Sequence, residues 1–193
     1  VKYAEQYLPD LLPNLSTCRS PQAMFGSLLK ELLPEQLKVE RKDLKVVAIM
    51  PCTAKKFEAQ RPEFSVDGQQ DVDHVLTTQE LAHMIQSAGL LFNSLQPESF
   101  DMPFGFYTGA GVIFGNSGGV MEAVVRYAAE KVSGGKLERV EFQELRGDSG
   151  LREAKINVDG TELKLAIMHG LRNARVVAQQ VREGKSQYDL IEV

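Results

Sequence analysis

Cysteine is scarce in this sequence of 193 residues, which contains only Cys18 and Cys52. Two cysteines cannot build a disulfide framework, and alone they cannot supply the four ligands of a structural metal site. The three histidines, at positions 74, 83 and 169, show no HExxH or other metal-ligand spacing. No Ser-His-Asp or Gly-x-Ser-x-Gly hydrolase pattern is present. The residues therefore offer neither a self-contained metal site nor a familiar hydrolase site.

Long apolar runs and excess positive charge are also missing. No run approaches the roughly 20 apolar residues that cross a bilayer, and no signal-peptide pattern opens the chain. The formal net charge is −4, so nothing indicates a nucleic-acid partner. Hydrophobic residues at 43% and charged residues at 25% are typical of a globular protein. We expect no membrane span, no nucleic-acid partner and a cytoplasmic location, with the periplasm as the alternative.

Both ends of the chain have the pattern of an element interior. "VKYAEQY" reads as a helix already under way, and "QYDLIEV" as a strand without a polar tail. The ends of natural domains are usually polar and exposed. We therefore expect this sequence to be an interior piece of a longer protein.

Helical and strand-like segments alternate along the chain, which predicts the α/β class. A helix is expected after Ser20 as N-cap and Pro21 at the first helical position, with Pro34 beyond its end. Residues 44–50 form a continuous β-branched run, typical of a strand that is buried on both faces. A second helix is expected from Thr77 or Thr78 to a stop at Gly89. Apolar residues show no helical or strand periodicity over residues 92–105, where we place a boundary between two lobes.

The second half of the chain contains the clearest local signal, a β-hairpin over residues 151–168. A two-residue Asp159-Gly160 turn keeps the apolar residues of both arms on one face, so turn and pattern agree. Helices are expected near residues 119–131 and 171–184, and strands near 137–147 and 188–193. The predicted hairpin pairs are Val158 with Thr161, Ile156 with Leu163, and Ala154 with Leu165.

The stretch "MPCTAKKFEAQRPE" places Cys52 directly after the predicted strand. The carboxyl edge of an open α/β sheet is where ligands bind, and Pro51 should end the strand pairing. Lys55 could lower the pKa of a nearby thiol or hold an anionic ligand. The alternatives are a small core cysteine and a solvated helix start with surface charges.

Two further stretches are candidate functional sites. "GAGVIFGNSGG" opens a helix and could cradle phosphate, but it lacks the Lys-Ser/Thr of a P-loop and departs from the dinucleotide fingerprint. We prefer glycines that permit close backbone approach to a bulky neighbour. In "STCRSPQAMFG" the hydroxyls are most simply explained as helix caps and turn bonds.

In their order and spacing, "LPNLSTCRSPQAMFG", "MPCTAKKFEAQRPE" and "GAGVIFGNSGGVMEAVVR" resemble the catalytic domain of the iron-only (di-iron) hydrogenases, over essentially the whole chain. The resemblance implies an α/β fold with two lobes of largely parallel sheets flanked by helices. It implies reversible reduction of protons to hydrogen at an H-cluster. This cofactor is a 4Fe–4S cluster joined to a di-iron subcluster that carries carbon monoxide, cyanide and a bridging dithiolate. The partners implied are a ferredoxin or cytochrome electron carrier, protons and hydrogen, and maturation proteins.

The resemblance also implies a role for individual residues. Cys52 matches a metal ligand of the 4Fe–4S cluster, and Lys55 matches the lysine that donates to a di-iron cyanide. Ser16 matches the serine of the proton relay, whereas Cys18 matches a position that is not a ligand. The remaining matches line the cofactor pocket or pack beside the cluster: Pro21, Gln22, Met50 and Phe114.

The cluster cysteines other than Cys52 are not in this sequence, and one thiolate cannot hold a cubane. Residues 1–193 are therefore expected to be part of a hydrogenase catalytic domain, inactive and without a bound cofactor when isolated. The alternative is a hydrogenase-like iron–sulfur assembly protein that keeps the fold without the di-iron chemistry. A third interpretation is a non-catalytic binding scaffold whose glycine loop holds a nucleotide.

Overall fold

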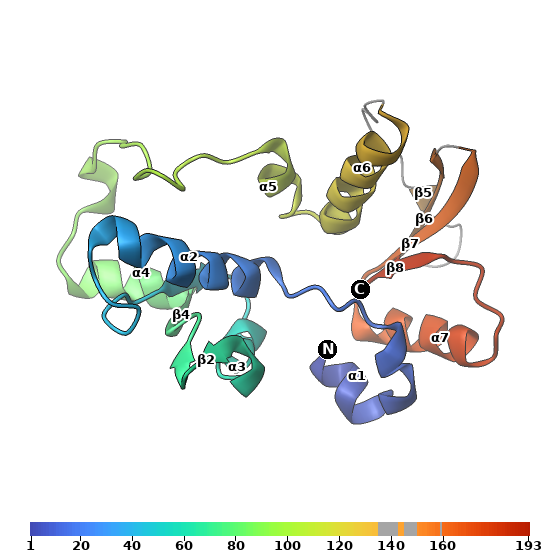
Figure 1. The fold of residues 1–193 in the computed structure, drawn as a ribbon. Helices are drawn as coiled ribbons and strands as arrows, with labels where there is room; N and C mark the ends of the chain where they lie inside the picture. The colour runs from blue at the N-terminus through green and yellow to red at the C-terminus, as the bar shows by residue number, and fades with distance from the viewer. Residues whose placement is uncertain (135–142, 145–149, 159) are drawn as a thin grey trace. The chain divides into compact units, whose positions relative to one another are not determined.

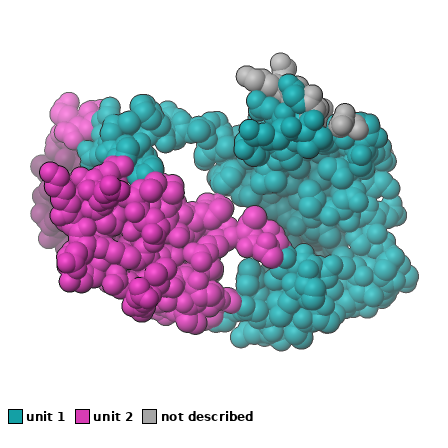
Figure 2. All heavy atoms as spheres, in the orientation of Figure 1, with its two compact units in different colours: residues 1–15, 99–193 teal, residues 16–98 magenta. Residues whose placement is uncertain are grey.

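The computed structural model describes residues 1–134, 143–144, 150–158 and 160–193. The chain divides into two compact units (Figure 2). Unit 1 comprises residues 1–15 and 99–193, and unit 2 comprises residues 16–98. The first fifteen residues thus belong with the C-terminal half of the chain, which the order of predicted elements does not indicate.

Unit 2 is built around a parallel pair of strands, β1 (Val47–Met50) and β4 (His74–Thr77) (Figure 1). Between them the chain forms α3 (Ala54–Ala59), the 3-10 turn η2 (Pro62–Phe64) and a small hairpin of β2 (Ser65–Val66) and β3 (Gln69–Gln70). This hairpin was not among the predicted elements, although its Asp67-Gly68 turn, with φ of 51° and 74°, is a typical two-residue turn.

Strand β1 is not buried on both faces, contrary to our expectation. Val47 and Ile49 are 48% and 46% exposed, whereas Ala48 and Met50 face inward. The inward residues pack against a small core of Ala59, Val72 and Val75. The alternation arises because successive side chains of a strand point to opposite faces, and α3 covers only one of them.

The helices of unit 2 begin where the sequence predicts. Helix α2 (Pro21–Leu37) starts after Ser20, whose Oγ accepts the Ala23 N–H at 3.2 Å. Helix α4 (Thr78–Ser87) starts after Thr77 in a full capping box with Glu80, and the 3-10 turn η3 (Phe92–Ser94) follows.

The expectation that Pro34 lies beyond the end of α2 is wrong, because the helix continues through it to Leu37. Proline in the last turn removes one N–H···O bond but keeps a helical φ and its carbonyl group. That carbonyl oxygen accepts the Val39 N–H at 3.0 Å, and Lys38, with φ of 56°, ends the helix.

Unit 1 contains a four-stranded sheet in the order β5 (Gln143–Glu144), β6 (Leu151–Val158), β7 (Thr161–Met168) and β8 (Leu190–Glu192). The hairpin β6–β7 has the predicted register, with Ala154, Ile156 and Val158 opposite Leu165, Leu163 and Thr161. Its turn residue Asp159, and the predicted strand at 137–147 apart from residues 143–144, lie outside the described residues. Strand β8 pairs with β7 in parallel and β5 pairs with β6 antiparallel, so this sheet is mixed.

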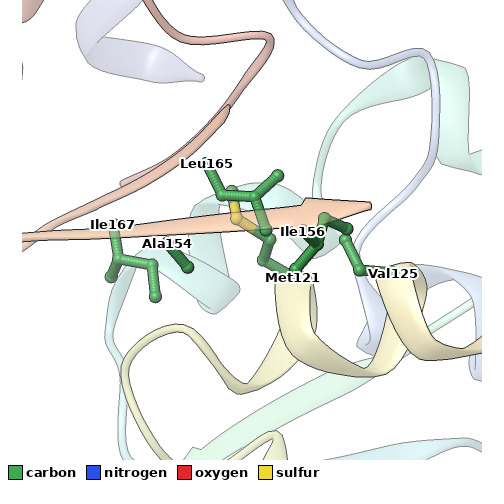
Figure 3. Close-up of a cluster of buried hydrophobic side chains, with 6 residues drawn as sticks. All are labelled: Met121, Val125, Ala154, Ile156, Leu165 and Ile167. Carbon is green, nitrogen blue, oxygen red and sulfur yellow. The ribbon is translucent and has the colours of Figure 1, made fainter. Parts of the chain in front are cut away.

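The helices of unit 1 are α1 (Lys2–Tyr7), α5 (Gly109–Ile113), α6 (Gly119–Ser133) and α7 (Leu171–Arg182), with the 3-10 helix η1 (Pro9–Asn14) after α1. Helices α6 and α7 pack against opposite faces of the sheet, because the strand residues alternate. Leu165 and Ile167 belong to one buried cluster with Met121 and Val125 of α6 (Figure 3). Ala166 and Met168 contact Val177 of α7. This arrangement confirms the predicted α/β class.

Among the described residues, no helix combines the length and the apolar character that a membrane span requires.

Candidate functional site

The junction between β1 and α3 places Cys52 at the carboxyl end of a parallel strand. Pairing with β4 ends at Met50, and α3 begins after Thr53, so Pro51 and Cys52 form the connection. The Cys52 thiol is free and exposed, which excludes the alternative of a small core cysteine in unit 2. A thiol at this position is available to a ligand at the carboxyl edge of the sheet.

Lys55, in the first turn of α3, is held by one contact within its own helix and one contact to α2. Its Nζ donates to Oε2 of Glu58 at 2.5 Å, and its side chain is only 22% exposed. The other carboxylate oxygen of Glu58 accepts the hydroxyl of Ser20, the N-cap of α2. Gln22 Nε2 donates to the Lys55 carbonyl oxygen at 3.4 Å. The interpretation as freely solvated surface charges therefore does not fit Lys55.

The structure thus brings together Lys55, Gln22 and the first turn of α2, and adds Glu58 and Ser20, of which the sequence predicted only Ser20, as a helix cap. Glu58 orients the ammonium group of Lys55, and Ser20 links that carboxylate to α2. The i,i+3 spacing of Lys55 and Glu58 is a sequence signal for the first contact. No local signal predicts the second, because Ser20 and Glu58 are 38 residues apart.

The remaining site residues of unit 2 have different environments. Gln22 Oε1 is buried and has no hydrogen-bond partner among the described residues, so it is available to accept a bond. Pro21 is the exposed first residue of α2. Ser16 lies in the exposed loop before α2, where its Oγ accepts the Cys18 N–H at 3.2 Å, a turn bond of the expected kind. Met50 packs into the core beneath α3.

Phe114 belongs to unit 1, where it follows α5 and donates its N–H to the Ala110 carbonyl oxygen at 3.1 Å. The five glycines of residues 109–119 fall into two groups, according to the space around each one. A Cβ atom on Gly118 would lie 2.0 Å from Ile167 Cδ1, and one on Gly119 would lie 1.8 Å from the Ile113 carbonyl oxygen. These two glycines are required by neighbours within the protein. The other three, Gly109, Gly111 and Gly115, have no atom closer than 3.8 Å to such a Cβ position.

The N–H groups at the start of α6, which follows the glycines, already have hydrogen-bond partners within the protein. The Gly118 and Met121 N–H groups donate to the two carboxylate oxygens of Glu192, at 2.9 and 2.7 Å. A phosphate group at this helix start would need the same donors. The geometry therefore argues against the nucleotide-binding interpretation of the glycine stretch.

Buried charges fix the loop that carries Ser16 and the start of α2. The Asp71 side chain is 2% exposed, and its two oxygens contact Arg19 at 3.0 Å and Arg41 at 2.5 Å. Arg19 directly precedes the N-cap Ser20.

A second carboxylate, Asp73, lies close by in sequence. Burial acts to raise the pKa of Asp73, but hydrogen bonds from Lys30 and the Val46 N–H outweigh this effect and hold that pKa below its usual value.

A second ion pair joins α3 to α4 on the surface. Lys56 Nζ donates to both carboxylate oxygens of Glu80, at 2.6 and 2.7 Å. These bonds, together with the N–H of Thr77, lower the pKa of Glu80 to about 2. Lys55 and Lys56 are therefore adjacent in sequence but bind different carboxylates. Lys55 faces the start of α2, and Lys56 fastens the start of α4.

Within the described part of the chain, no three His, Cys, Asp or Glu side chains come together as a group that could hold a metal ion. Cys52 is thus a single candidate thiolate, accompanied by a half-buried ammonium group and an orphaned amide oxygen on α2. The thiol of Cys52 and the ammonium group of Lys55 fit one edge of a large anionic iron–sulfur group, to which the Gln22 oxygen, an acceptor, offers no donor, and together they do not form a complete set of ligands.

Fold and site together define an α/β protein with a candidate iron–sulfur ligand at a strand end. Residues 1–193 match the family described as "Iron only hydrogenase large subunit, C-terminal domain", and the chain belongs to this family. The chain is 47% identical, over 191 residues, to the periplasmic [Fe] hydrogenase large subunit of Nitratidesulfovibrio vulgaris. That alignment covers 99% of this chain and 45% of the relative.

Two further matches are an assembly factor and a solved hydrogenase structure. A probable cytosolic Fe-S cluster assembly factor of Aedes aegypti is 35% identical over 202 residues, covering 100% of this chain and 42% of the relative. The solved structure of an apo [FeFe]-hydrogenase from Chlamydomonas reinhardtii superposes with a TM-score of 0.84 at 34% identity, covering 98% of this chain and 55% of that one. The chain thus spans less than half the length of the Nitratidesulfovibrio vulgaris and Aedes aegypti relatives.

Proposed function

We propose that the chain forms part of an iron-only hydrogenase, which reduces protons reversibly to hydrogen at a 4Fe–4S cluster joined to a di-iron subcluster. The observation that carries this proposal is the β1–α3 junction. An exposed free thiol, Cys52, stands three residues before Lys55, which is fixed by Glu58 and α2. Membership of the hydrogenase large-subunit family supports the same conclusion.

When bound, the H-cluster supplies the electrons and the iron site at which protons are reduced. In this proposal the Cys52 thiolate is one ligand of the cubane, and the other thiolates are not among residues 1–193. Lys55 has three N–H donors and uses one on Glu58, so two remain for a cyanide of the di-iron subcluster. A charge-assisted bond of this kind is short and strong.

The other assigned residues shape the pocket. Gln22, whose Nε2 donates to the Lys55 carbonyl oxygen, forms the wall with Pro21 and Phe114, and Met50 supports the cluster from the core. Ser16 Oγ passes protons, and it keeps its own O–H for this purpose because it accepts rather than donates in the turn bond.

We propose further that residues 1–193 are one part of the catalytic domain, with a lobe boundary near residues 92–105. The isolated chain would then bind no cluster and be inactive, because it supplies a single cubane ligand. The electron carrier would be a ferredoxin or a cytochrome, and maturation proteins would insert the di-iron subcluster. Since one relative is named periplasmic and another cytosolic, both compartments stay open, with the cytoplasm as our first expectation.

The first test uses the two cysteines as a matched pair. The Cys52→Ala variant of the natural protein, taken through maturation, should contain no cluster iron and should produce no hydrogen, because each cubane ligand is needed. Cys18→Ala is the control: that thiol is also free and exposed but has no assigned ligand role. Full activity of Cys52→Ala, or equal losses in both variants, would contradict the assignment.

The second test uses the adjacent lysines. Lys55→Met should weaken retention of the di-iron subcluster about 10- to 100-fold, the loss expected for one hydrogen bond to a charged group, and should leave the cubane in place. Lys56→Met removes a neighbouring charge that binds Glu80 instead, so it should have little effect. The readout is the infrared spectrum of the carbon monoxide and cyanide ligands, together with iron content.

The iron–sulfur assembly factor stays as the second candidate, because the mosquito relative aligns over the whole chain. The same spectrum separates the two functions. Matured natural protein that contains iron–sulfur cluster but shows no carbon monoxide or cyanide bands would favour the assembly factor.

A further inference from the structure

Helix α6 begins without a cap from its own sequence. Its N-cap is Gly118, which has no side chain to accept an N–H, and its φ of 87° suits glycine. The first turn of a helix has N–H groups without an intrahelical partner. Here Gly118 and Met121 donate theirs to Oε1 and Oε2 of Glu192, which lies 74 and 71 residues further along the chain.

The sheet register explains how a distant carboxylate reaches this helix. Glu192 on β8 is paired with Ile167 on β7, and side chains of paired residues share a face. Ile167 packs on that face against α6 (Figure 3), and it lies so close to Gly118 that no Cβ could be added there. One residue pair of the sheet thus supplies both an apolar contact and a carboxylate to the start of α6.

The start of α6 in turn fixes the segment that carries Phe114. The Gly119 N–H donates to the Asn116 carbonyl oxygen at 2.9 Å, and the Asn116 N–H donates to that of Ile113 at 3.0 Å. Gly119 also lies against the Ile113 carbonyl group, where a Cβ atom would be 1.8 Å away. From Ile113 to Gly119 the backbone is therefore a chain of short turns with little room to rearrange.

We infer that Glu192 is a positioning residue for the pocket wall: its carboxylate fastens the glycine corner of residues 115–119 to the sheet and thereby sets the position of Phe114. This inference rests on the proposed function for the role of Phe114, but not for the cap itself. A carboxylate suits the task because it offers two acceptor oxygens and a negative charge to a helix N-terminus. Glutamine offers one acceptor and directs an NH₂ group at an N–H donor.

The test compares Glu192→Gln with Glu162→Gln in the natural protein. Glu162 lies on β7, and its side chain is 54% exposed with a 3.5 Å surface ion pair to Lys155, so its replacement is a matched loss of one charge. Without cofactor, Glu192→Gln should speed hydrogen exchange of the Gly118 and Met121 amides about ten-fold, the size of effect known for a lost helix cap. Glu162→Gln should leave both amides unchanged.

The second readout is made on matured protein. Glu192→Gln should shift the carbon monoxide and cyanide infrared bands while the iron content stays at the wild-type level, because only the position of the wall changes. Glu192→Asp keeps both acceptor oxygens on a shorter side chain and should restore part of the amide protection. It also provides a usable variant if Glu192→Gln does not fold.

Unchanged exchange at both amides would overturn the inference. Faster exchange with identical infrared bands would also overturn it, since the cap would then be structural only. If the wild-type protein shows no such bands after maturation, the proposed function fails and the positioning role fails with it. The exchange data would still report on the cap by itself, so the two failures can be told apart.

Discussion

Replacement of the buried carboxylate Asp71 by asparagine should destabilise unit 2 strongly. The Asp71 side chain is 2% exposed and bonds to Arg19, which is 40% exposed, and to Arg41, which is 19% exposed. Asparagine keeps one acceptor oxygen and directs an NH₂ group at the other guanidinium. Arg41 would keep only its contact to Glu31, at 2.6 Å, whose side chain is 62% exposed, and its Nε is already buried without a partner among the described residues.

The size of this effect follows from the exposure of the two arginines. Removal of one partner of a buried ion pair costs about 3–5 kcal/mol, and a hydrogen bond to a charged group contributes about 1.5–3 kcal/mol. The bond to Arg19 counts for less, because solvent screens an arginine that is 40% exposed. We expect Asp71→Asn to lower the free energy of unfolding of unit 2 by about 3 kcal/mol.

Native-state hydrogen exchange of the β1 and β4 amides in the natural protein measures this free energy locally. Asp43→Asn is the matched control, since Asp43 is an exposed turn residue of the same unit, and it should change the value by less than about 0.5 kcal/mol. A loss below about 1 kcal/mol for Asp71→Asn would refute the reasoning. It would mean that the two arginines are solvated once the charge is removed.

Two further predictions concern stability. Lys56 is the main cause that holds the pKa of Glu80 at about 2, below the ordinary 4.5, so the contribution of Glu80 is present above about pH 4.5 and is lost as the pH falls towards 2. Lys56→Met should therefore flatten the acid side of a Tm-against-pH profile, and an unchanged profile would contradict this. Gly119→Ala should cost about 3 kcal/mol or more, because its Cβ would lie 1.8 Å from the Ile113 carbonyl oxygen, whereas Gly109→Ala should stay within about 0.5 kcal/mol in the same unfolding assay.

Much of the local structure could be predicted from sequence because its causes are local. The Ser20 cap, the Thr77 capping box and the β6–β7 register each follow from residues a few positions apart. The errors arose where local rules are weak. A proline in the last turn costs one hydrogen bond, so Pro34 did not end α2. An apolar run cannot by itself reveal that one face of β1 stays exposed in its unit.

The candidate site, too, has some features that the sequence predicted and others that it did not. The order of residues around Cys52 predicted its position after a strand, and the sequence resemblance predicted the family, which the comparison with known proteins confirmed. The link from Ser20 to Glu58 was not predictable, because nothing within a few residues of either side chain requires the other. The roles assigned to Cys52 and Lys55 stay predictions until the cysteine and lysine pairs are compared.

The sequence by itself determined the α/β class, the Ser20 and Thr77 caps, the β6–β7 register, and the position of Cys52 ahead of two lysines. Only the tertiary structure decided which charges are buried and which distant side chains accept the N–H groups at the helix N-termini. Asp71 meets Arg19 across 52 residues, and Glu192 reaches Gly118 across 74. The physical reason is that buried charges and unpaired N–H groups must find partners, while the chain leaves open where those partners come from until its strands and helices pack.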